Sequence, residues 1–129
     1  MDEVFELTDT ETDIVTRLEQ RIPYREDIFG SKIQYNQILE DLVLNARYVA
    51  LSRIYPFYDY STKELPTKYA NWQYRCSIEL YNLADKQAFS NYSENGLSWS
   101  RLTDGISEQL LMEITSKAGI PSKVSEENE

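Results

Sequence analysis

Residues 66–88 form a predicted helix whose apolar side chains lie on two separate sides. At about 100° of rotation per residue, the first stripe consists of Tyr69, Trp72, Cys76, Leu80 and Leu83. The second stripe consists of Ala70, Tyr74, Ile78, Tyr81 and Ala88. One stripe is enough to bury a helix against its own domain, so the second indicates a further contact. We expect Tyr74, Ile78 and Tyr81 to contact another subunit, and the alternative is a central helix covered on both sides by its own domain.

The periodicity of the remaining sequence predicts an all-α fold, a small bundle of three to four helices. A first short helix is expected to begin at Thr10 or Thr12 and to end before Pro23. Residues 24–31 are expected to form a loop. The longest apolar pattern covers residues 33–55, and its face is so broad that we expect this helix to be the centre of the core.

After residue 89 the pattern predicts a protruding β-hairpin or extended loop, followed by one more helix. The polar stretch 90–101 contains Asn95-Gly96, which is the strongest short signal for a hairpin. We expect this loop to make exposed contacts through Tyr92, Asn95, Leu97 and Trp99. A last helix is expected to be capped by Thr103 or Asp104 and to continue to about Thr115.

Acidic residues gather at the two ends of the chain, whose net charge is −9. Residues 1–13 hold six acidic and no basic residues, whereas residues 14–121 hold 13 acidic and 12 basic ones. Phosphate binding needs clustered Lys or Arg, so we expect no grip on nucleic acid. We expect an acidic N-terminal segment, residues 1–11, and a polar C-terminal segment, residues 116–129. Such ends are usually solvated, but they also dock on basic partners or line a passage through which DNA slides.

The length of 129 residues predicts one domain, residues 1–129, with its helical body over 12–115. No apolar run approaches 18 residues, so we expect no membrane span, and the acidic N-terminus does not fit a signal peptide. The single cysteine, Cys76, lies on the first stripe and is expected to act as a small buried hydrophobe in a reducing compartment.

Catalysis and metal binding find little support in the residue types. The chain has no histidine, and its four glycines form no phosphate-binding loop. Asp9, Glu11 and Asp13 have the spacing that opens a calcium loop, but Ile14 occupies the glycine position and Gln20 the twelfth position. We therefore expect no catalytic residue, no metal and no cofactor, and a protein that is not an enzyme but works by contact.

Three segments of the chain together resemble a known family. Residues 69–82 read YANWQYRCSIELYN, residues 92–101 read YSENGLSWSR, and residues 104–114 read DGISEQLLMEI, followed by KAGIP. In this order and spacing they resemble the head–tail connector (adaptor) proteins of long-tailed double-stranded DNA phages. The resemblance covers residues 33–121 and depends on a helix, loop and helix pattern rather than on catalytic residues.

The resemblance implies a small helical bundle that assembles into a ring, typically dodecameric, beneath the portal at the capsid vertex. The ring would extend the channel through which DNA passes without specific binding, and would offer a platform for a head-completion (stopper) or tail protein. It also implies a location in the virion, at the head–tail interface, after assembly in the host cytoplasm. By the same resemblance the C-terminal segment would dock into the portal, with the candidate residues Lys117, Ile120, Pro121, Lys123 and Val124.

Two other classes of function are alternatives to the connector. A small acidic helical interaction or regulatory protein, such as an inhibitor that mimics DNA on a nucleic-acid-binding enzyme, would need carboxylates spread over its folded body. The nearly neutral body of residues 14–121 argues against that distribution. A small enzyme with an unrecognised site is opposed by the absence of histidine.

Overall fold

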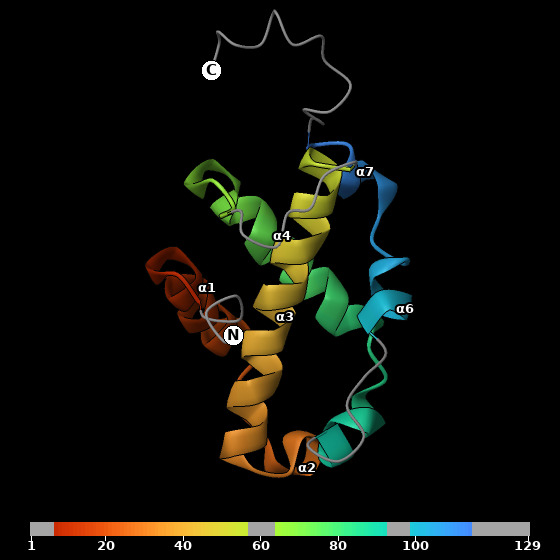
Figure 1. Ribbon diagram of the computed structural model, residues 1–129. Coiled ribbons are helices and arrows are strands. Elements are labelled where there is room, and N and C mark those ends of the chain that lie inside the picture. Colours follow the sequence, from red (N-terminus) through yellow and green to blue (C-terminus); the bar gives the residue numbers. More distant parts are fainter. Residues whose placement is uncertain (1–6, 57–63, 93–98, 115–129) are drawn as a thin grey trace, which may run out of the picture.

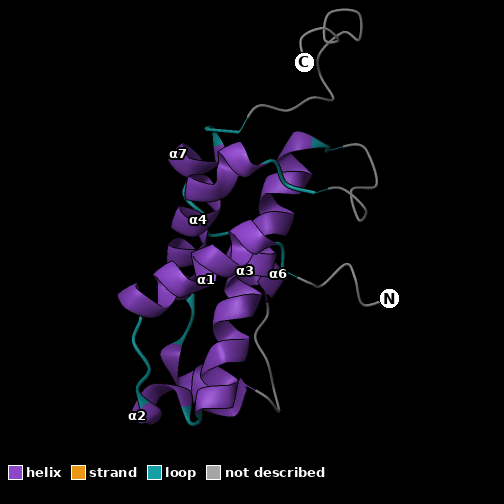
Figure 2. Cartoon of the chain, turned by 90° about the vertical axis from the view of Figure 1, so that its left-hand side faces the viewer, coloured by secondary structure: helices purple, strands orange, loops and turns teal. Residues whose placement is uncertain are grey.

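The computed structural model describes residues 7–56, 64–92 and 99–114, and every regular element in these three ranges is helical (Figures 1 and 2). The prediction of an all-α fold is therefore confirmed. The predicted hairpin is not confirmed, because residues 93–98 lie outside the described ranges. The predicted number of helices is not confirmed either, because several of the described elements are only one turn long.

Helix α1, Asp9–Arg21, begins earlier than the sequence led us to expect. Its N-cap is Thr8, whose hydroxyl accepts a hydrogen bond from the Glu11 N–H at 3.1 Å, while the Glu11 carboxylate accepts one from the Thr8 N–H at 3.0 Å. This reciprocal pair is a capping box, and it fixes the first turn more firmly than Thr10 or Thr12 could. The expected acidic segment 1–11 was therefore too long, since residues 9–11 belong to the helix.

A single helical turn occupies part of the predicted loop 24–31. This turn, α2, covers Glu26–Phe29 and ends at Gly30, whose φ of 83° favours glycine. The hydroxyl of Ser31 then accepts a hydrogen bond from the Gln34 N–H at 3.1 Å and caps α3, Lys32–Ile54. The observed bounds of α3 lie close to the predicted 33–55.

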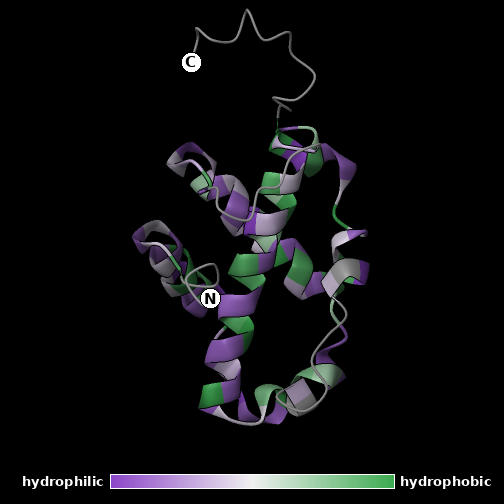
Figure 3. Cartoon of the chain, in the orientation of Figure 1, coloured by the Kyte–Doolittle hydropathy of each residue, from purple (hydrophilic) through white to green (hydrophobic). Residues whose placement is uncertain are grey.

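Helix α3 is the centre of the fold, as its broad apolar face predicted. In Figure 1 it runs between α1 on one side and α6 on the other, and Figure 3 shows apolar residues along its whole length. Its buried apolar side chains are Tyr35, Ile38, Leu39, Leu42, Val43, Leu44, Ala46, Ala50, Leu51 and Ile54. Within the described ranges, no helix is both long and apolar enough to cross a membrane.

The predicted helix 66–88 is divided into three elements. A 3₁₀ turn, η2, covers Thr67–Tyr69, and α4 follows over Ala70–Leu83. Ala84 is extended, and a second 3₁₀ segment, η3, covers Lys86–Asn91. Helix α4 packs mainly against α3 and α1, so these three helices form the main body of the core.

At the N-terminal end of α3, the elements α2 and η3 pack against each other and against α3 (Figure 1). The Phe29 and Phe89 rings stack with their centroids 5.6 Å apart. The buried amide of Gln34 donates hydrogen bonds to the carbonyl oxygens of the same two residues, at 2.6 and 2.8 Å. One polar side chain of α3 therefore joins two segments that are far apart in the sequence.

The last predicted helix, from a cap at Thr103 or Asp104 to about Thr115, is shorter than expected. Only the turn α7, Glu108–Leu111, is helical within it, with Ser107 as the N-cap. Helix α6, Trp99–Thr103, lies before it, where the sequence predicted the end of the loop 90–101. The backbone and hydroxyl of Ser107 both donate hydrogen bonds to the Glu79 carboxylate of α4, each at 2.9 Å. These bonds fix the start of α7 to α4. Ile106, Leu110 and Ile114 are buried, as the periodicity predicted.

Candidate functional site

The second stripe of α4, with the candidate interface residues Tyr74, Ile78 and Tyr81, is partly buried against the core of its own chain. The guanidinium carbon of Arg17, on α1, lies 3.9 Å from the centre of the Tyr74 ring, in cation–π geometry. Tyr81 stacks on Phe89 with ring centroids 5.7 Å apart, and Lys86 Nζ lies 4.3 Å from the Tyr81 ring.

These contacts give the second stripe partners within the domain, which is what the alternative derived from the sequence predicts. Each of the three candidate side chains is only partly covered, however. A contact with another subunit would therefore use the part of Tyr74, Ile78 and Tyr81 that the domain leaves exposed.

The first stripe of α4 faces the core for most of its length. Trp72, Cys76 and Leu80 are buried, whereas Leu83 at the end of the helix is 43% exposed. Burial, with a smaller contribution from the negative charge of Glu79, raises the pKa of the Cys76 thiol to about 12. The thiol therefore stays protonated and unreactive at neutral pH, and Cys76 is the small buried hydrophobe that the sequence predicted.

Of the expected exposed loop contacts, Tyr92 was assigned wrongly. Tyr92 is buried, its hydroxyl donates a hydrogen bond to the Asp41 carboxylate of α3, and its ring packs edge-on against Trp99 with centroids 6.4 Å apart. Trp99 is partly buried at the start of α6. These contacts hold Tyr92 and Trp99, the described residues on either side of 93–98, against the domain. Asn95 and Leu97 lie outside the described residues.

The pair of Asp41 and Tyr92 titrates abnormally because it is largely shielded from water. Burial raises the pKa of Asp41, and the hydrogen bond from Tyr92 lowers it by a smaller amount. Burial and the carboxylate of Asp41 together raise the pKa of Tyr92, so the phenol remains a donor at neutral pH.

The candidate portal-docking residues Lys117, Ile120, Pro121, Lys123 and Val124 all lie outside the described residues. The expectation for this segment therefore continues to depend on the sequence resemblance alone.

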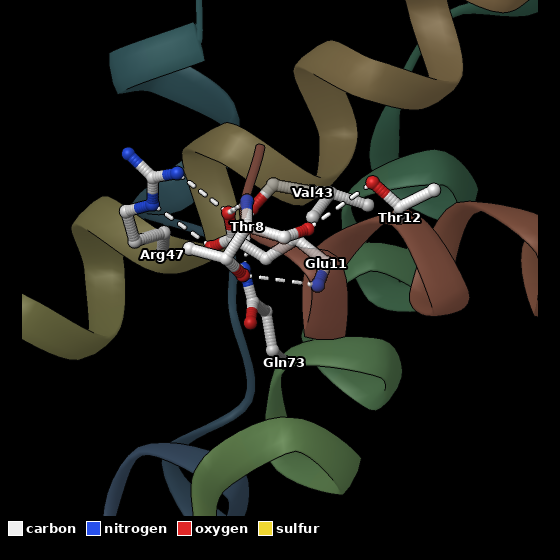
Figure 4. A network of polar contacts seen from close by, with 6 residues as sticks. All are labelled: Thr8, Glu11, Thr12, Val43, Arg47 and Gln73. Atoms are coloured by element: carbon white, nitrogen blue, oxygen red, sulfur yellow. Dashed lines mark hydrogen bonds and ion pairs between the residues drawn. The ribbon is translucent and has the colours of Figure 1, made fainter. Parts of the chain in front are cut away.

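A buried polar network joins α1, α3 and α4, and the sequence did not lead us to expect it (Figure 4). Arg47 donates two parallel hydrogen bonds to Glu11, from Nε to Oε2 at 2.8 Å and from Nη2 to Oε1 at 2.5 Å. Gln73 Nε2 donates to the same Glu11 Oε2 at 2.8 Å and to the Val43 carbonyl oxygen at 3.0 Å. Glu11 and Gln73 are each 2% exposed and Arg47 is 7% exposed.

Both members of the buried ion pair are charged at neutral pH. Burial by itself raises the pKa of Glu11, but the hydrogen bonds from Arg47, Gln73 and the Thr8 backbone outweigh burial, and the net pKa lies below the usual 4.5. The hydrogen bond to Glu11 raises the pKa of Arg47. The network therefore orients three helices through fully charged and paired groups, and it is not poised for proton transfer.

Two signals in the sequence could have revealed this network. The spacing Thr8-x-x-Glu11 is the pattern of a capping box, which places Glu11 in the first turn of a helix instead of in a tail. Arg47 interrupts the apolar face of residues 33–55 between Val43 and Ala50, and a charge at such a position requires a partner. Nothing in the sequence shows that Gln73 completes the set.

The described part of the chain holds no cluster of acidic, cysteine or histidine side chains that could bind a metal ion. We also compared the chain with models of protein families, with curated proteins and with solved structures, and none of them matches it.

Proposed function

We propose that this protein is a structural virion protein, a head–tail connector that forms a ring beneath the portal and extends the DNA channel toward the tail. The observation that carries the proposal is the ordered set of segments 69–82, 92–101 and 104–114, which resembles that family. The all-helical character of the described residues agrees with the helical bundle that the family implies.

The charge distribution supports the same proposal. A channel component must let DNA pass without strong phosphate contacts, and residues 14–121 are nearly neutral, with 13 acidic and 12 basic residues. Residues 1–13, of which 9–13 lie in α1, and residues 122–129 add negative charge, which repels DNA further. A protein that instead occupied a DNA-binding enzyme by mimicry would concentrate its carboxylates on the folded body.

Ring closure needs two different surfaces on each subunit, because the contacts are heterologous. We assign one of them to the exposed parts of Tyr74, Ile78 and Tyr81 on α4. Residues 117–124 would dock into the portal, and Asn95 and Leu97 would meet the stopper or tail protein. In this proposal the partners are further copies of the chain, the portal protein and the next head-completion protein.

Deletion of residues 117–129 tests the portal contact directly. Helix α7 and the described core end before this segment, so we expect the shortened chain to keep its helical circular dichroism spectrum and its unfolding midpoint. Sedimentation of the full-length chain mixed with the portal protein should give a complex, and the shortened chain should give none. Unchanged docking of the shortened chain would contradict this role for the segment.

A further inference from the structure

A hollow of about 230 Å³ lies beside the buried polar network, between the N-terminus of α1 and the start of α4. One water molecule occupies about 30 Å³ of liquid, so the hollow has room for the end of a side chain. The residues that border it and that matter here are Asp9, Glu11, Glu64, Thr67 and Gln73.

Gln73 borders this hollow and carries an acceptor, Oε1, that no described residue pairs. Both hydrogens of its Nε2 are used, one by the Glu11 carboxylate and one by the Val43 carbonyl oxygen, and no described residue donates a hydrogen bond to its Oε1. Exchanging the two amide atoms would set an oxygen against two other oxygens, so the orientation is fixed. The covalent geometry of the amide turns Oε1 away from Glu11 (Figure 4). The side chain of Gln73 is only 2% exposed, so leaving its acceptor without a hydrogen bond costs free energy. A ligand that donates a hydrogen bond to Oε1 would remove this cost.

The charge at the hollow is negative. Arg47 neutralises Glu11, but Asp9 and Glu64 are exposed and have no basic partner among the ion pairs of the described residues. None of the described residues that border the hollow is Lys or Arg. The N-terminus of α1 contributes only about half of one positive charge, which two carboxylates exceed. The complementary ligand is therefore a cation.

We propose that the hollow binds the ammonium or guanidinium group of a Lys or Arg side chain from a partner protein. Gln73 Oε1 accepts a hydrogen bond from the cation, and Asp9 and Glu64 balance its charge. That the partner is the portal or a neighbouring subunit rests on the proposed function, whereas the preference for a cation does not.

The test is a titration of the full, ¹⁵N-labelled chain with N-acetyl-arginine amide and N-acetyl-lysine amide, at constant ionic strength and observed by NMR. We expect saturable shifts of the Gln73 side-chain amide and of the Asp9 and Thr67 backbone amides. The double variant D9N/E64Q should bind at least tenfold more weakly. The matched control D13N/E40Q removes two exposed carboxylates that do not border the hollow, and it should bind like the unaltered chain.

Three results would overturn the inference: no saturable shift at these residues, an equal loss of affinity in D13N/E40Q, or stronger binding of N-acetyl-glutamate amide, which would point to the helix N-terminus as an anion site. The NMR shifts can be observed whether or not the chain assembles into a ring. A failed titration would therefore leave the connector proposal standing, and binding by a chain that never joins a portal would leave the cation site without the connector role.

Discussion

At the scale of single residues, the buried pair of Glu11 and Arg47 has the largest consequence for the fold. Removing two charges from water is costly, and the cost is offset here by two parallel hydrogen bonds and by the donors of Gln73 and Thr8. The exposed pair of Arg25 and Asp27, at 2.8 Å, makes the same kind of bond in water and contributes little.

We expect Glu11→Ala or Arg47→Ala to lower the free energy of unfolding by about 3–5 kcal/mol, because each leaves a buried charge without its partner. Urea denaturation measures this loss. Thr8→Ala removes only part of the cap and should cost about 1 kcal/mol, and Asp27→Asn should cost less than about 0.5 kcal/mol. A loss for Glu11→Ala no larger than that for Asp27→Asn would contradict the role of the network.

The contribution of Glu11 to the free energy of unfolding should also depend on pH. The folded state lowers the pKa of Glu11 below 4.5, so its contribution is fully present above that value and is lost as the pH falls through the lowered pKa. The difference in stability between the unaltered chain and Glu11→Gln should therefore shrink as the pH falls below about 4.5. A difference that stays constant down to the lowest pH at which both chains fold would show that the charge of Glu11 is unimportant.

At the scale of elements, α3 was predictable because local and tertiary preferences agree. The Ser31 cap, the long apolar pattern and the stop before Pro56 all define the same helix. The predicted helix 66–88 was too long, because the periodicity continues past the point where the extended Ala84 ends α4. Lys86 Nζ donates to the carbonyl oxygens of Tyr81 and Ala84, at 2.6 and 3.1 Å, and so completes that helix end.

The last helix shows why apolar spacing alone does not give the bounds of an element. Ile106 and Leu110 are both buried, but Ile106 lies in the connection between α6 and α7 and only Leu110 is helical. The bonds from Ser107, the N-cap of α7, to Glu79 join residues 28 positions apart, which apolar spacing does not show. The surroundings of the candidate interface residues on α4 were predictable only in part. The two stripes of α4 were visible in the sequence, but the partners of the second stripe, Arg17 and Phe89, were not.

Substitutions at Ile78 and at Leu80, two residues apart on α4, distinguish a role in assembly from a role in folding. Ile78 is partly exposed, so Ile78→Ser should lower the free energy of unfolding by only about 1–2 kcal/mol and should abolish ring assembly. Leu80 is fully buried, and Leu80→Ser should destabilise the fold by about 3–5 kcal/mol. Native mass and urea denaturation of both variants give the comparison. An Ile78→Ser chain that assembles normally would assign the second stripe to its own domain alone.

At the scale of the whole molecule, one long helix organises the described chain, and α1 and α4 are fixed to it by apolar packing and by a charged network. Residues 14–121 are nearly neutral, and the excess of acid lies in residues 1–13, which include the first turns of α1, and in residues 122–129. These properties agree with the proposed role as a subunit of a ring around DNA, in which DNA would meet no concentration of positive charge.

The central claim, assembly beneath a portal, is tested most directly by native mass, measured for the purified chain alone and mixed with the portal protein of a long-tailed phage. We expect a ring-sized assembly, formed either by the chain itself or on the portal. A chain that stays a monomer in both samples and leaves the portal unchanged would contradict the connector role, and the acidic interaction protein would then be the better explanation.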